Sequence, residues 1–99
     1  MNMEKIEVDK IYSREECTSR LVSKLKEELM DVISYNNLYE SCMAHGHYED
    51  AKDIEHIARQ EYGHAEIIYE ILEDREGEMR NSPEIKAMWE TVKEIFDEE

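Results

Sequence analysis

Residues 54–72 read IEHIARQEYGHAEIIYEIL, a run in which apolar residues recur three and four positions apart. This spacing predicts an amphipathic α-helix. Two polar residues interrupt its apolar track, which runs through Ile54, Ile57, Glu61, His64, Ile68 and Ile71. Because residues three apart are neighbours on a helix, Glu61 and His64 should lie side by side on a face that we expect to be buried. A buried carboxylate without a partner costs several kcal/mol and a metal ion removes that cost, so the pair is a candidate half of a metal site.

A second acid interrupts the apolar face of an earlier helical segment. The residues along the centre of this face form a seam, in which they recur alternately four and three positions apart: Leu21, Leu25, Glu28, Val32, Tyr35, Tyr39 and Cys42. Glu28 stands in its middle, where an aliphatic residue is normal. Taken alone, Glu28 could lie at the edge of the seam with its carboxylate in solvent. Because two separate helices each carry an acid at the centre of an apolar face, a shared metal site is the stronger interpretation.

The composition predicts one small helical domain. The chain has 99 residues, of which 38% are charged, 3 are Gly and 1 is Pro, which favours all-α structure. The net charge of -14 argues against nucleic acid as a partner, since its phosphates need a basic surface. The same charge can draw in cations or simply keep the protein soluble. No apolar run reaches the length of a transmembrane helix, so we expect no membrane partner.

The two cysteines indicate a reducing environment. Cys17 and Cys42 are separated by about 37 Å along a continuous helix, at 1.5 Å per residue. They cannot pair within one chain, so we expect reduced thiols and a cytoplasmic protein. The first residues also lack the apolar core of a signal peptide.

Capping signals set the expected helix boundaries. Ser13 and Glu16 have capping-box spacing, so a first helix should cover residues 14–45 and end at Gly46. A second helix should cover residues 48–76. Ser82 followed by Pro83 predicts the start of a third helix over residues 83–97. Residues 1–12 have no clear helical period and are expected to form an extended arm, which leaves residues 13–99 as the helical domain.

The helix lengths predict a dimer. The short link at residues 45–47 makes the first two helices an antiparallel hairpin. Their apolar faces are too wide to cover each other, and the third helix is too short to complete a bundle. We therefore expect two hairpins to form one four-helix bundle.

Two such hairpins would supply a complete di-metal ligand set. Each chain offers Glu28 from one helix and Glu61 with His64 from the next. A two-fold axis would double this to four carboxylates and two imidazoles, the set found in ferritin-like di-iron proteins. Oxygen donors with one imidazole per metal suit iron or manganese.

The same residues resemble a known family. The segments Glu27-Glu28-Leu29, Tyr35 and Glu61-x-x-His64-Ala65-Glu66 are similar to the encapsulated ferritins, half-length members of the ferritin-like superfamily, over roughly residues 13–97. The resemblance implies a half-ferritin domain that oxidises Fe(II) to Fe(III) for iron storage and detoxification. It also implies an annular homo-oligomer, often a decamer, inside an encapsulin shell.

The resemblance assigns roles to individual residues. It implies that Glu28, Glu61 and His64 are the catalytic iron ligands, at a di-iron centre shared by two chains. It places Glu27 near the metal entry and Tyr35 beside the site. Met30 stands where the family tends to have a second entry carboxylate, and the adjacent Asp31 is a candidate for that role.

Two other functions stay open. One is a rubrerythrin-like di-iron enzyme that acts on peroxide or an organic substrate. The other is a non-enzymatic helical dimerisation module, in which the buried acids only set the pairing register.

Other candidate residues have simpler expected roles. We expect solvent exposure for the side chains of His45, His47 and His56, and a packing role for those of Tyr35, Tyr39, Tyr62 and Tyr69.

Overall fold

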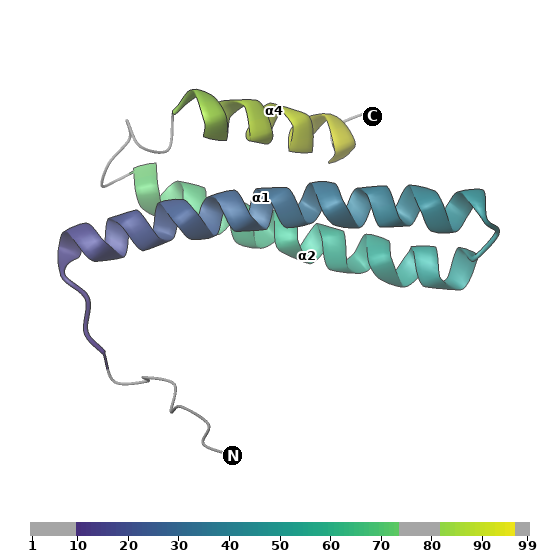
Figure 1. The fold of residues 1–99 in the computed structure, drawn as a ribbon, viewed down its shortest axis with the longest axis horizontal. Helices are drawn as coiled ribbons and strands as arrows, with labels where there is room; N and C mark the ends of the chain where they lie inside the picture. The colour runs from purple at the N-terminus through teal and green to yellow at the C-terminus, as the bar shows by residue number, and fades with distance from the viewer. Residues whose placement is uncertain (1–9, 74–81, 97–99) are drawn as a thin grey trace, which may run out of the picture.

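The computed structural model describes residues 10–73 and 82–96. It contains helices α1 (Arg14–Ala44), α2 (Tyr48–Glu73) and α4 (Pro83–Phe96), and no strand in the described part of the chain. α1 and α2 run antiparallel as a long hairpin, and α4 lies along one side of it (Figure 1). The predicted all-α hairpin with a short third helix is confirmed.

The capping residues act as the sequence predicts. The backbone N–H of Glu16 donates to the Ser13 hydroxyl at 3.1 Å, and the Ser13 N–H donates to the Glu16 carboxylate at 3.1 Å. α1 ends at Ala44 with His45 as its cap, and Gly46 follows with φ of 77°. Because only glycine adopts this conformation without strain, Gly46 ends the helix. Ser82 accepts from the backbone N–H of Ile85 at 3.3 Å at the start of α4.

Parts of three predictions lie outside the described residues. These are most of the N-terminal arm, the end of the second helix beyond Glu73, and the last residue of the third helix. Residues 10–12, at the end of the predicted arm, are not helical.

The core fills the space between the three helices. It consists of Leu25, Leu29, Val32, Ala65, Leu72, Ile85 and Val92, all fully buried. On α2, the buried residues are seven positions apart: Ala51, Ala58, Ala65 and Leu72. Because three of these four side chains are small, α1 can approach this face of α2 closely.

The isoleucine face of α2 is only partly covered in the single chain, and its burial by a second hairpin stays a prediction. Ile57 and Ile71 are 37% and 38% exposed, whereas Ile54 and Ile68 are partly buried. The physical reason is that α2 is apolar on two faces. The alanine-rich face packs against α1, which turns the face of Ile57, His64 and Ile71 outward.

Aromatic stacking attaches α4 to α2. The ring of Tyr62 stacks on Phe96 with centroids 4.9 Å apart, and Tyr69 stacks on Trp89 at 4.7 Å. An ion pair between Lys26 and Glu84, 3.1 Å apart, joins α1 to the start of α4. These contacts support the predicted packing role of Tyr62 and Tyr69. They also place α4 on a different side of α2 from His64.

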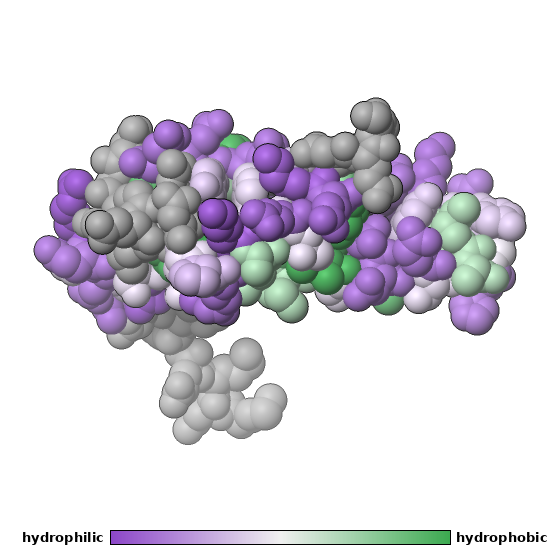
Figure 2. Space-filling model, turned by 90° about the horizontal axis from the view of Figure 1, so that it is seen from above, coloured by the Kyte–Doolittle hydropathy of each residue, from purple (hydrophilic) through white to green (hydrophobic). Residues whose placement is uncertain are grey.

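The surface agrees with the composition. The face in Figure 2 is largely hydrophilic, with smaller groups of apolar residues between the charged ones.

Cys17 and Cys42 are both free thiols, as predicted for a single chain. Within the described residues, no helix combines the length and the apolar character that crossing a bilayer requires.

Candidate metal centre

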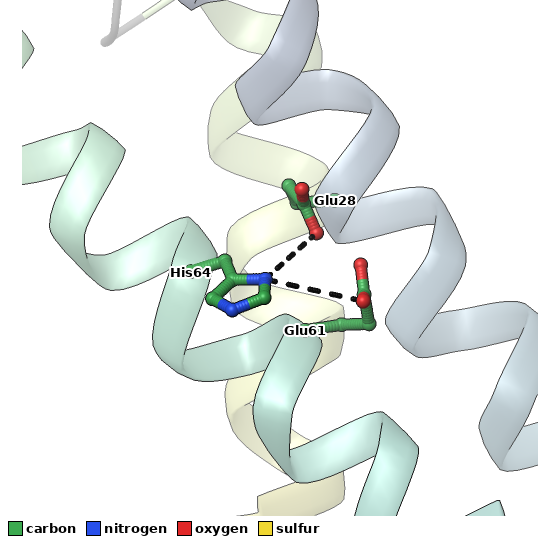
Figure 3. Close-up of side chains that lie close together, drawn as sticks. All are labelled: Glu28, Glu61 and His64. Carbon is green, nitrogen blue, oxygen red and sulfur yellow. Dashed lines mark ion pairs between the residues drawn. The ribbon is translucent and has the colours of Figure 1, made fainter.

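Glu28 from α1 meets Glu61 and His64 from α2 beside the hairpin interface. The three side chains point toward one another (Figure 3), and one donor atom from each lies within 4.8 Å of the other two. Nδ1 of His64 is 3.8 Å from Oε2 of Glu28 and 3.9 Å from Oε1 of Glu61. These separations are too long for direct hydrogen bonds. They leave room for one cation to contact all three groups.

Local structure fixes each of these side chains. Glu61 and His64 are neighbours because they are one helical turn apart on α2. Glu28 lies between Leu25 and Leu29, which are fully buried in the core. Their burial sets the rotation of α1 about its axis, and this rotation directs the Glu28 carboxylate toward α2.

The electrostatics of Glu28 show that burial and neighbouring carboxylates outweigh the nearby positive charge of Lys24. Its side chain is 20% exposed, and its Oε2 atom is buried without a hydrogen-bond partner. Burial, followed by the neighbouring Glu61 and Asp31 carboxylates, raises the pKa of Glu28 to about 7, against a smaller opposing effect of Lys24. A cation at this position would stabilise the ionised form. The unpartnered oxygen and the donor set of two carboxylates and one imidazole therefore fit a bound iron or manganese ion.

His64 makes the centre open on one side. Its side chain is 57% exposed, compared with 21% for Glu61. The single chain therefore presents a half-site on its surface, and burial of the Glu61–His64 pair between two chains stays a prediction. The other described histidines (His45, His47 and His56) are exposed or partly exposed, and none of them joins the converging group.

The residues assigned to the surroundings of the site differ in position. Glu27 is exposed and forms an ion pair with Lys24 at 3.2 Å, so it is not among the three converging groups. Asp31 is exposed, and its charge acts on Glu28. Tyr35 is on α1, two turns beyond Glu28. Entry and second-sphere roles for these three residues stay predictions.

Lys24 is a residue that the sequence reasoning missed. Its positive charge opposes the rise in the pKa of Glu28. The signal was present in the sequence, because Lys24 precedes Glu28 by one helical turn.

Comparisons with known proteins identify the family of this chain. A family model described as rubrerythrin matches residues 20–98, a range that contains Glu28, Glu61 and His64. Searches of curated proteins and of solved structures gave no match. The chain therefore belongs to the rubrerythrin family, whose members are di-iron oxidoreductases of the ferritin-like superfamily.

Proposed function

We propose that this protein is an iron oxidase that converts Fe(II) to Fe(III) at a di-iron site formed by two copies of the chain. The convergence of Glu28, Glu61 and His64 around an unpartnered carboxylate oxygen carries this proposal. The expected role in iron storage or detoxification follows from it. A decameric ring and an encapsulin shell stay predictions of the family resemblance.

The need for two copies follows from the ligand count. One chain brings two carboxylates and one imidazole, which is half of the set that di-iron bundles use. The half-site also opens onto an apolar surface, since Leu38 is 48% exposed and Ile57 and Ile71 are each more than one-third exposed. A second hairpin over this face would bury these side chains and supply the missing donors.

The side chains of the site have separate tasks. Glu28 and Glu61 supply oxygen donors and compensate the positive charge of the ions, while His64 supplies a nitrogen donor. When bound, Fe(II) gives electrons to oxygen or peroxide. The open side at His64 is where the second chain would add its donors, and the net charge of -14 raises the local concentration of metal ions.

The family match also favours a second candidate, a rubrerythrin-like enzyme that reduces peroxide with electrons from the same centre. An enzyme for an organic substrate has less support. A pocket of about 120 Å³ lies between α1, α2 and the end of α4, but none of the three ligand candidates lines it. The preferred oxidant distinguishes the iron oxidase from the peroxide-reducing enzyme, because the oxidase should work efficiently with oxygen alone.

The test uses Fe(II) added under anaerobic conditions, followed by oxygen or by hydrogen peroxide. We expect ferric absorbance to grow with oxygen in the wild-type protein, and Glu61→Ala to abolish the growth above the rate in buffer. Glu66→Ala is the matched control, because Glu66 is exposed on the same helix. Oxidation that is unchanged in Glu61→Ala would exclude the proposed site. A rapid reaction with peroxide and none with oxygen would favour the second candidate.

A further inference from the structure

Both cysteines lie on the side of α1 that carries Glu28. Cys17 precedes Glu28 by 11 positions and Cys42 follows it by 14, which is close to three and four whole turns of about 3.6 residues. α1 is continuous over this range (Figure 1). Both thiols are free and only partly buried in the single chain. The open site face of α1 therefore has a cysteine near each end.

The two cysteines are nearly symmetric about Glu28. Cys17 is about 16 Å from the level of Glu28 along the axis, and Cys42 is about 21 Å away in the other direction. Their midpoint falls about 2 Å from Glu28. A two-fold axis near Glu28, perpendicular to α1, would therefore bring Cys17 close to the level of the partner subunit's Cys42.

Charges on the same face favour this antiparallel arrangement over a parallel one. Lys24 precedes Glu28 by four positions and Asp31 follows it by three, and both are exposed. The same two-fold axis would place Lys24 opposite the partner's Asp31, whereas parallel helices would set like charges against each other. In the single chain, Lys24 contacts Glu27 at 3.2 Å, but their side chains are 64% and 63% exposed. Such an exposed pair is weak and can be exchanged.

We propose that Cys17 of one chain lies opposite the partner subunit's Cys42 in the dimer, so that oxidation links the two copies of α1 at two symmetric positions. This inference rests on the two-chain site proposed above. Facing Cα atoms of helices packed 8–10 Å apart are separated by about 4–5 Å, and an axis at Glu28 adds an offset of about 4–5 Å along the helices. The two Cα atoms are then about 6–7 Å apart, at the upper end of the range that a disulfide spans.

The reaction is thiol–disulfide exchange. Two cysteine thiols and one small-molecule disulfide, such as oxidised glutathione, give one protein disulfide and two small-molecule thiols. The cysteines lose two electrons and two protons, which the small molecule gains. Linked chains could no longer separate, so an oxidising environment would hold the two halves of the metal site together.

The experiment treats wild type, Cys17→Ser and Cys42→Ser with oxidised glutathione in the presence of Mn²⁺. Wild type should run at twice the mass of one chain on a non-reducing gel, and mass spectrometry should find only the Cys17–Cys42 peptide pair. Each variant alone should stay at the mass of one chain. A mixture of the two variants, unfolded and refolded together, should recover the linked dimer with one disulfide.

Several outcomes would overturn the inference. A Cys17–Cys17 or Cys42–Cys42 link, or linking of either variant alone, would show a different arrangement of the helices. A dimer in sedimentation that does not link would exclude the cysteine pairing but leave the two-chain metal site intact. A monomer in sedimentation with bound Mn²⁺ would contradict the proposed function itself.

Charge reversal tests the same register without cysteine chemistry. Lys24→Glu or Asp31→Lys should each weaken the Mn²⁺-bound dimer by about tenfold, because like charges then face each other. The two changes together should restore it. Failure of the double variant to recover would also overturn the antiparallel register.

Discussion

Oε2 of Glu28 lies 3.8 Å from Nδ1 of His64, although the two residues belong to different helices. The same oxygen is buried and has no hydrogen-bond partner. A buried carboxylate oxygen without a partner destabilises the folded protein unless the carboxylate takes up a proton or binds a cation. This arrangement should therefore affect metal affinity, the pH dependence of stability and the association of the chains.

Loss of the imidazole should weaken metal binding. We expect His64→Ala to lower the affinity for Mn²⁺ or Co²⁺ by about tenfold or more, because one of three donors in each chain is removed. His56→Ala is the matched control, since this histidine is outside the converging group on the same helix. Isothermal titration calorimetry measures both. Equal affinities in the two variants would show that His64 is not a ligand.

Removal of the Glu28 charge should stabilise the metal-free protein at high pH. The folded state raises the pKa of Glu28 from 4.5 to about 7. Between these values the folded chain holds more protons than the unfolded chain, so wild-type stability falls as pH rises through this window. Glu28→Gln has no such charge, and we expect it to gain roughly 1–3 kcal/mol over wild type above pH 7 and little below pH 4.5.

Urea unfolding in the presence of a chelator, at pH values on both sides of the window, measures this difference. Glu66→Gln controls for the loss of an exposed acid from the highly charged surface. Parallel stability profiles of Glu28→Gln and wild type would contradict the raised pKa.

Metal should promote association of the chains. Because the ligands are expected from two copies, Mn²⁺ binding favours the dimer, and the melting temperature should rise with both metal and protein concentration. Sedimentation and thermal melts with and without chelator test this. Identical subunit numbers and identical melting temperatures in both conditions would speak against a shared site.

The two glycines of the hairpin should respond to alanine in opposite directions. Gly46 has φ of 77°, so Gly46→Ala should destabilise the fold by about 1 kcal/mol. Gly63 is inside α2, and no neighbouring group lies within 4 Å of the position that an alanine Cβ would take, so Gly63→Ala should stabilise the helix by about 1 kcal/mol. Urea unfolding of both variants gives the two values. Destabilisation by Gly63→Ala in the dimer alone would indicate that a second copy packs there.

The sequence by itself determined the helices and the local half of the site. The capping box at Ser13, the turn at Gly46 and the start at Ser82 are short-range signals, and the structure confirms each of them. The neighbouring positions of Glu61 and His64 are equally local, because they follow from one helical turn. The polar interruption at Glu28 was visible for the same reason.

Only the tertiary structure decided which face of α2 is buried and how Glu28 reaches the other two residues. The helical period could not distinguish the alanine-rich face from the isoleucine face, since both are apolar. Close packing of α1 against Ala51, Ala58 and Ala65 selected the first face and left His64 exposed. The hairpin register that brings Glu28 beside His64 depends on this packing between distant residues, which spacing along one helix does not contain.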